Sequence, residues 1–203
     1  MELSLMKESS AGRVSRWLEL LGSVLFVLPG LLRADDWPQW LGPQRDAEWR
    51  ESGIIETFPP GGPTVRWRIP LGGGYSGPAV ARGRVYVMDR RLATGVSNPT
   101  NAFSRSEIAG TERVLCLNEA DGRILWQHEY ECPYTVSYAA GPRTTPAVDG
   151  GRVYTLGAEA NLYCLEAEAG AVRWSMDFTQ EFVIQTPSWG LYATPSGERE
   201  SLI

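Results

Sequence analysis

The sequence predicts an all-β fold assembled from repeated units of four short strands, and three observations lead to this prediction. Residues 77–89 resemble residues 145–157, and residues 113–127 resemble residues 161–175. Repeats of this kind are typical of folds that stack one unit on the next. Within each stretch, short runs of β-branched and aromatic residues are separated by turn residues. The 22 glycines and 14 prolines of the 203-residue chain fit a turn-rich β fold better than a helical one.

Four strands can be placed in the second copy of the repeat. They are expected at Ala147–Val148, Arg152–Leu156, Asn161–Leu165 and Ala171–Phe178. Pro146 precedes the first strand, where the missing N–H of proline is tolerated. Gly150 and Gly151 mark the first turn, and Gly170 closes the last hairpin. No stretch between these strands is long enough for a helix with its own apolar face.

The first copy contains a longer connection than the second. The extra residues lie within Arg90 to Glu112, in a stretch that is polar and rich in turn residues. Such composition is typical of an exposed loop, and we expect one here.

Both copies carry a tryptophan four residues after a glycine, as Gly122 with Trp126 and Gly170 with Trp174. A single four-stranded sheet cannot bury both of its faces and needs neighbouring sheets. Four-stranded units stacked around an axis form a β-propeller, and a tryptophan at a fixed point of each blade supplies a large packing area. We therefore predict that these four residues and Trp67 dock the blades against one another.

The repeats predict a partial β-propeller of about two full blades plus flanking strands. Trp67 marks the outer strand of an incomplete blade, and Pro195 marks the start of another. After Pro195 the stretch SGERESLI lacks the Gly-x-Val-Tyr element, so we expect no strand pair there. Because propellers close with about four to eight blades, the chain is expected to be a fragment of a longer propeller.

The stretches from Cys116 to Trp126 and from Cys164 to Trp174 resemble the tryptophan-docking motif of the PQQ-like (quinoprotein-type) repeat family, written Ala-x-Asp-x-x-Thr-Gly-x-x-x-Trp. The stretch DWPQWLGPQRD, which ends at Asp46, resembles the mature start of exported family members, including BamB-like ones. The glycine and tryptophan of the motif are present in both copies, whereas its polar residues are replaced. The resemblance implies a propeller whose packing positions are kept and whose turn hydrogen bonds are altered.

The N-terminus has the pattern of a signal peptide. Lys7, Arg13 and Arg16 precede the apolar run Leu20–Leu32, and a cleavage site is expected before Asp35. An uncleaved membrane anchor is the alternative. We therefore expect a signal peptide over 1–34, an N-terminal extension over 35–63 and the partial propeller over 64–203. The protein is expected to be exported to the periplasm or cell envelope, with no membrane span after cleavage.

Two function classes remain after composition is considered, besides a fragment with no independent activity. The net charge of −5 gives no reason to expect a nucleic-acid partner, and the single histidine excludes a histidine-rich metal site within this chain. The resemblance implies a non-catalytic scaffold module that binds protein or peptide partners, as in BamB-like proteins. The alternative is a PQQ- and Ca²⁺-dependent alcohol or sugar dehydrogenase. No residue is assigned a catalytic or metal-binding role, and His128 is expected to face solvent.

The three cysteines are an odd number, and we expect Cys116 and Cys164 to be small core residues.

Five residues are candidates for ligand binding at the mouth of the propeller funnel. Tyr75, Arg143 and Tyr192 each stand three residues before one of the prolines that open a blade, and neighbouring connectors carry Tyr138 and Trp189. Aromatic rings beside a cation could hold a flat or anionic ligand. Alternatively, the rings fill gaps between blade ends and Arg143 is solvated.

Overall fold

The computed structural model describes residues 34–195, 197–198 and 201–202, and the side chains up to Pro195. The chain divides into two units, Met1–Ala34 and Asp35–Ile203, and all elements below belong to the second unit. The predicted signal peptide lies outside the described residues apart from Ala34. The division into an N-terminal extension and a propeller part stays a prediction.

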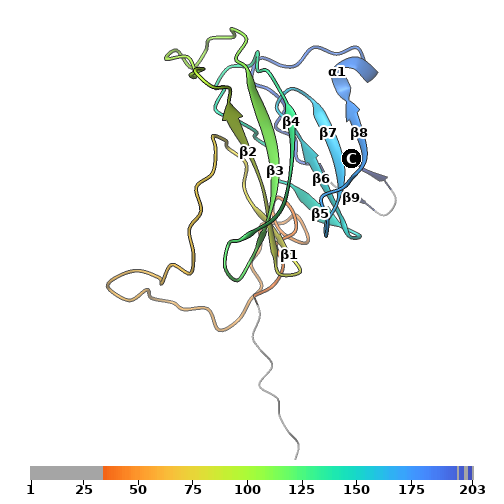
Figure 1. Ribbon diagram of the computed structural model, residues 1–203. Helices are drawn as coiled ribbons and strands as arrows, with labels where there is room; N and C mark the ends of the chain where they lie inside the picture. The colour runs from red at the N-terminus through yellow and green to blue at the C-terminus, as the bar shows by residue number, and fades with distance from the viewer. Residues whose placement is uncertain (1–33, 196, 199–200, 203) are drawn as a thin grey trace, which may run out of the picture. The chain divides into compact units, whose positions relative to one another are not determined.

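Two antiparallel sheets of four strands each form the body of this unit (Figure 1). The first sheet contains β1 (Ala79–Ala81), β2 (Arg84–Leu92), β3 (Gly110–Asn118) and β4 (Ile124–Glu131) in that order. The second contains β5 (Ala147–Asp149), β6 (Arg152–Leu156), β7 (Asn161–Glu166) and β8 (Val172–Asp177), again in chain order. Each sheet is thus a meander of the kind expected for one propeller blade.

The two sheets are copies of each other in register as well as in order. Tyr86 pairs with Cys116, which pairs with Trp126, and the equivalent row in the second sheet is Tyr154, Cys164 and Trp174. Both sheets have a register shift directly after the cysteine, between the third and fourth strands. The predicted all-β fold with two four-stranded blades is confirmed.

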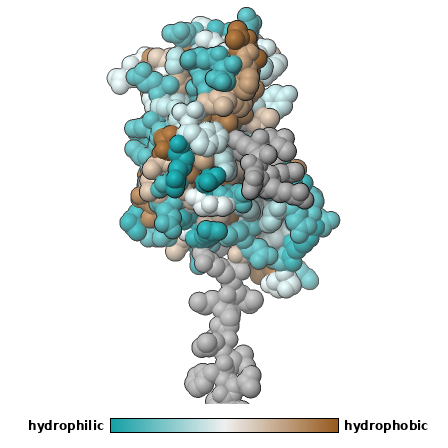
Figure 2. All heavy atoms as spheres, turned by 90° about the vertical axis from the view of Figure 1, so that its right-hand side faces the viewer, coloured by the Kyte–Doolittle hydropathy of each residue, from teal (hydrophilic) through white to brown (hydrophobic). Residues whose placement is uncertain are grey.

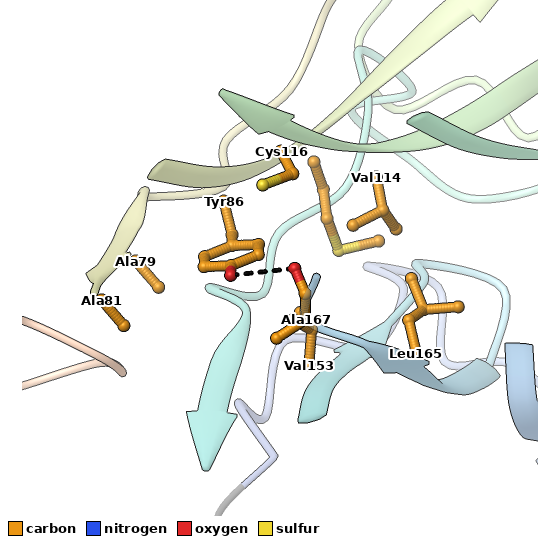
Figure 3. Close-up of a cluster of buried hydrophobic side chains, with 9 residues drawn as sticks. Ala79, Ala81, Tyr86, Val114, Cys116, Val153, Leu165 and Ala167 are labelled. Atoms are coloured by element: carbon orange, nitrogen blue, oxygen red, sulfur yellow. Dashed lines mark hydrogen bonds between the residues drawn. The ribbon is translucent and has the colours of Figure 1, made fainter. Parts of the chain in front are cut away.

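The main hydrophobic core lies between the two sheets (Figure 3). The first sheet contributes Tyr86 and Val114, and the second contributes Val153, Leu165 and the following Ala167. The Tyr86 hydroxyl donates a hydrogen bond to the Ala167 carbonyl at 3.2 Å, so the one polar atom of this side chain is satisfied inside the core.

Cys116 and Cys164 belong to the buried residues of the chain and are free thiols. Burial raises the pKa of both thiols, which keeps them protonated and unreactive. Their environment agrees with the small core residues that the sequence predicted.

Trp126 of the first sheet packs on the turn of the second sheet at Gly170. Its indole N–H donates to the Ala167 carbonyl at 3.0 Å. Gly170 has φ +69°, and a Cβ at this position would lie 2.5 Å from the Trp126 ring. The turn therefore needs glycine for both its backbone conformation and the close approach of the ring.

The same arrangement occurs once more, on the other side of the first sheet. Trp67 donates its indole N–H to the Glu119 carbonyl at 2.8 Å, and a Cβ at Gly122 would lie 2.6 Å from the Trp67 ring. Trp67 and Ile69 cover the face of the first sheet that points away from the second sheet. Trp174, the equivalent residue of the second sheet, is 39% exposed. Figure 2 shows the molecule from the β8 side, where hydrophobic residues gather near the upper end and hydrophilic ones are spread over much of the rest.

The segment around Trp67 differs from its prediction, because residues 64–72 form no strand. A strand needs a hydrogen-bonded partner. The segment pairs with the first sheet only at the isolated bridge between Gly73 and Arg90. Trp67 is therefore placed by its docking contacts and not by a sheet.

The long connection of the first copy lies within the predicted range. Arg90 and Glu112 pair with each other in β2 and β3 and are buried, so only residues 93–109 form the loop. The strands extend because their charged side chains find buried partners, as described below. The polar residues at these strand ends led to the prediction of a loop.

Two further corrections concern the C-terminal part. The last strand of the second sheet ends at Asp177, whose carboxylate accepts the Thr179 N–H at 2.9 Å and caps α1 (Phe178–Glu181). After Pro195 we expected no strand pair, but β9 (Gly197–Glu198) and β10 (Ser201–Leu202) pair antiparallel. They are two residues long each, and the sequence pattern used for full strands does not detect them.

Residues near the start of the second unit join the two sheets. Trp37 bridges Val80 of β1, with N–H to carbonyl distances of 2.8 and 2.9 Å. The next residue, Pro38, accepts the Val148 N–H of β5 at 2.8 Å. The first strands of both sheets are thereby tied to one short segment.

Substitution of the docking glycine tests this packing. Gly170→Ala should lower the free energy of unfolding by about 1–2 kcal/mol through backbone strain and by about 1–3 kcal/mol more through the clash with Trp126. Gly150→Ala is the matched control, because Gly150 also has positive φ but a Cβ there meets nothing within 4 Å. Urea unfolding measures both losses, and equal losses for the two variants would contradict the docking contact.

Candidate functional site

All five residues predicted at the funnel mouth line one open pocket. Tyr75, Tyr138, Arg143, Trp189 and Tyr192 enclose a volume of about 350 Å³, which we call the aromatic pocket. Tyr75 precedes the first sheet, Tyr138 and Arg143 lie between the sheets, and Trp189 and Tyr192 follow the second sheet. The pocket is therefore built from segments far apart in the sequence, while ligand binding by these residues stays a prediction.

The rings of the pocket pack on one another. Tyr138 and Trp189 stack with ring centroids 5.3 Å apart and an interplanar angle of 28°. Tyr75 lies under the Arg143 guanidinium, 5.5 Å from its carbon to the ring centroid. Tyr75, Trp189 and Tyr192 remain 54%, 50% and 73% exposed. The pocket thus presents ring faces and edges to solvent.

Phe103 belongs to this cluster and was missed by the sequence analysis. It lies in the 93–109 loop and meets both Tyr138 and Trp189 edge to face, at centroid distances of 5.5 and 5.9 Å. The loop is held there because the Tyr138 N–H donates to the Ala102 carbonyl at 2.7 Å. Phe103 is the only aromatic residue in an otherwise polar loop, and this was the signal that could have found it.

The Arg143 guanidinium is hydrogen-bonded within the chain. Its guanidinium donates to the carbonyls of Gly141 at 2.7 Å, Ser137 at 2.6 Å and Tyr138 at 2.8 Å. It is half-buried. These hydrogen bonds tie Arg143 to the 137–143 loop, and its role in ligand binding stays a prediction. Tyr138 occupies the left-handed region at φ +55°, a conformation that these hydrogen bonds help to hold.

A second pocket of about 120 Å³ adjoins the aromatic pocket, and Tyr75 and Tyr138 line both. The remaining residues of the second pocket come from the 93–109 loop and from the connector after Tyr138: Asn98, Pro99, Asn101, Ala102, Ser104, Ala139 and Ala140. The two tyrosines form the ridge between the pockets.

Buried charges fasten these loops to the first sheet. Asp89 and Arg113 form an ion pair of 2.5 Å, and Asp89 also accepts the Gly72 N–H at 2.6 Å, three residues before Tyr75. Arg90 donates to the carbonyls of Ala139 at 3.0 Å and Ile108 at 2.6 Å. One ion pair and one arginine thus position the segments on both sides of the second pocket.

Glu112 links the first sheet to the second sheet through buried hydrogen bonds. It is fully buried and accepts hydrogen bonds from the Tyr130 and Tyr134 hydroxyls and from the Ala158 N–H at 3.1 Å. The Ala158 carbonyl in turn accepts the Leu191 N–H at 3.0 Å, next to the Trp189 segment. Burial raises the pKa of the Glu112 carboxyl, against the lowering effect of the two tyrosine hydrogen bonds.

These buried charges were not predicted. Their sequence signal was present as the pairs Asp89-Arg90 and Glu112-Arg113, which interrupt apolar strand sequence and bring opposite charges into cross-strand register.

His128 is another correction. Its ring packs against Tyr163 at a centroid distance of 4.8 Å and does not face solvent. Burial lowers its pKa, which favours the neutral ring. It lies between the sheets and lines neither pocket, so no catalytic role is assigned to it.

Within the described part of the chain, no group of three or more His, Cys, Asp or Glu side chains could hold a metal ion. Nor does any helix among these residues have the length and apolar character to cross a membrane.

Residues 110–199 match the family model described as outer membrane protein assembly factor BamB. The matched range begins with β3 and includes the whole second sheet, with the docking pair Trp126 and Gly170. The match supports the predicted PQQ-like repeat over these residues. The matched range thus includes β3, β4, the second sheet and the connectors that carry Tyr138, Arg143 and Trp189.

Solved structures similar to this chain include the following two proteins. A quinohemoprotein alcohol dehydrogenase from Pseudomonas putida HK5 is 20% identical over 68% of this chain and 18% of its own, with a TM-score of 0.43. BamB from Moraxella catarrhalis is 17% identical over 65% of this chain and 46% of its own, with a TM-score of 0.35. The chain spans less than half the length of either. No curated protein matches it.

The buried carboxyl Glu112 gives a pH-dependent prediction. Because its pKa is raised above the ordinary value of 4.5, the folded protein holds this proton over a pH range in which the unfolded chain has lost it. The stability contributed by Glu112 therefore falls as pH rises from 4.5 towards the raised pKa. Glu112→Gln keeps an acceptor oxygen but cannot ionise, so its stability relative to the wild type should increase as pH rises above the ordinary pKa of 4.5. Urea unfolding across this range measures the difference, and a difference independent of pH would contradict the account.

Proposed function

We propose that this chain is a non-catalytic binding module for protein or peptide partners and that the aromatic pocket is its binding site. The observation that carries the proposal is the pocket itself: four exposed or half-exposed rings from three segments, beside one arginine whose donors are already used. Exposed apolar clusters of this kind favour partner binding, because water leaves the rings when a partner covers them.

Aromatic residues suit such a role energetically. Tyrosine and tryptophan give large contact areas with few rotatable bonds, and they are enriched among residues that dominate binding energy. Tyr138 and Trp189 are already packed on each other and on Phe103, so these rings lose little conformational freedom on binding.

Export to the cell envelope is part of the proposal. The basic residues Lys7, Arg13 and Arg16, followed by the apolar run 20–32, support a signal peptide. The description of the matching family model, an outer membrane protein assembly factor, supports a role beside other envelope proteins.

The alternative function requires PQQ and Ca²⁺, and the residues of the pocket do not fit this pair. Calcium takes about six to eight oxygen ligands, and an alcohol dehydrogenase also needs a base for the substrate proton. No carboxylate lines the aromatic pocket or the adjoining one. The Arg143 donors that could meet a cofactor carboxylate are bound to backbone carbonyls. We therefore derive no chemical step for this site.

Selection from a random peptide library displayed on phage tests the proposal without assuming a sequence. The full chain should enrich peptides that bind the wild type and lose binding to Trp189→Ala, because half of this side chain is available to a partner. Trp40→Ala is the matched control, since Trp40 is 53% exposed but lines neither pocket.

Two results would overturn the proposal. One is a library that yields no peptide whose binding depends on Trp189. The other is saturable uptake of PQQ in the presence of Ca²⁺ together with dye-linked oxidation of an alcohol, which would establish the dehydrogenase instead.

A further inference from the structure

We infer that the aromatic pocket and the adjoining pocket together recognise a proline-rich segment of a partner protein in the polyproline II conformation. The inference rests on the proposed function and names the kind of segment that this site takes. Its starting point is the pair of adjacent hollows, about 350 and 120 Å³, divided by the ridge of Tyr75 and Tyr138. A polyproline II helix repeats every three residues, so it presents rings on one face at intervals of about 9 Å. Neighbouring hollows with an aromatic ridge between them suit such a ligand.

The backbone around the pockets favours a ligand that needs no strand pairing. The N–H groups of Tyr75, Tyr138 and Ala140 already donate to the carbonyls of Pro142, Ala102 and Tyr138, at 2.7, 2.7 and 2.8 Å. A peptide that binds by adding a strand needs free N–H and C=O groups along a sheet edge. Polyproline II makes no ladder, because proline lacks the N–H and the backbone stays solvated.

The charge of the site excludes two other ligand classes. Among the residues that the structure describes, Arg143 is the only charged one that lines either pocket. Its terminal nitrogens are held by three carbonyls, which leaves no arginine fork for a phosphate or an acidic peptide. With no carboxylate present and a guanidinium in the wall, a cationic ligand is also disfavoured. An uncharged apolar segment remains.

The polar groups that are available match the polar groups of a proline-rich chain. The hydroxyls of Tyr75, Tyr138 and Tyr192 make no hydrogen bond within the described part of the chain, and neither does the Trp189 indole N–H. These are donors at the rim of an apolar hollow. The carbonyls of a polyproline II helix are unpaired acceptors, so each can take one of these donors.

A carbohydrate is the rival occupant with similar affinity for aromatic faces. A sugar ring carries hydroxyls on most of its carbons, and each buried hydroxyl needs a partner. The larger pocket offers aromatic rings and one engaged arginine, with no amide or carboxylate side chain. The polar residues Asn98, Asn101 and Ser104 lie only in the smaller pocket. The larger pocket therefore favours proline rings over sugar rings.

Isothermal titration calorimetry of the full chain with an acetylated nine-proline peptide tests the inference. We expect saturable binding of this peptide and none of a Gly-Ser peptide of the same length. Tyr75→Ala and Trp189→Ala should each weaken binding about tenfold or more, as expected for central aromatic contacts. Trp40→Ala should leave the affinity unchanged. All three side chains are largely exposed, so urea unfolding should show similar stability for the variants and thereby separate lost binding from lost folding.

The outcomes distinguish this inference from the proposed function. If the nine-proline peptide fails to bind while the phage library yields Trp189-dependent peptides without proline, this inference is wrong and the binding function stands. If neither probe binds, both are wrong. Binding of cellohexaose in place of the peptide, equal peptide binding by all variants, or self-association of the chain through Trp189 would each overturn the proline-rich partner.

Discussion

The close packing of the Trp126 ring on the Gly170 turn is the contact on which the rest of the structure depends. It joins the fourth strand of one sheet to the last hairpin of the next, and its indole hydrogen bond to the Ala167 carbonyl fixes the orientation of the ring. The aromatic pocket draws Tyr75 from one side of this junction and Trp189 from the other. A shift between the sheets would therefore separate the walls of the pocket.

Buried charges complete the junction at the ends of β2 and β3 that adjoin the 93–109 loop. Burying a polar or charged group is costly unless it is paired and hydrogen-bonded, and here each group has several partners. The Asp89–Arg113 pair holds the segment before Tyr75, Arg90 holds two loop carbonyls, and Glu112 reaches across to the second sheet. Replacing these groups by apolar ones would keep a core but leave the loops without their anchors. These buried polar groups therefore determine the position of the loops more than the stability of the sheets.

The repeats made much of this fold predictable, because each position could be compared with its counterpart. The four-strand pattern, the cysteines in the core and the Gly-Trp spacing all follow from that comparison. The pocket residues Tyr75 and Arg143 were found in the same way, by their equal distance from a blade-opening proline. Phe103 could not be found by comparing the two copies, because the 93–109 loop has no counterpart in the second copy. The partners of Arg143 and Glu112 are backbone carbonyls, tyrosine hydroxyls and an N–H brought together only by folding, so a sequence pattern cannot assign them.

A double-mutant cycle between Trp126 and Gly170 tests the central contact most directly. Urea unfolding would give the cost of Gly170→Ala in the wild type and in a Trp126→Leu background. If the ring and the turn are in contact as described, the cost in the Trp126→Leu background falls to that of backbone strain alone, about 1–2 kcal/mol. If Gly170→Ala costs the same in both backgrounds, the two residues are not coupled and the packing of the sheets described here is wrong.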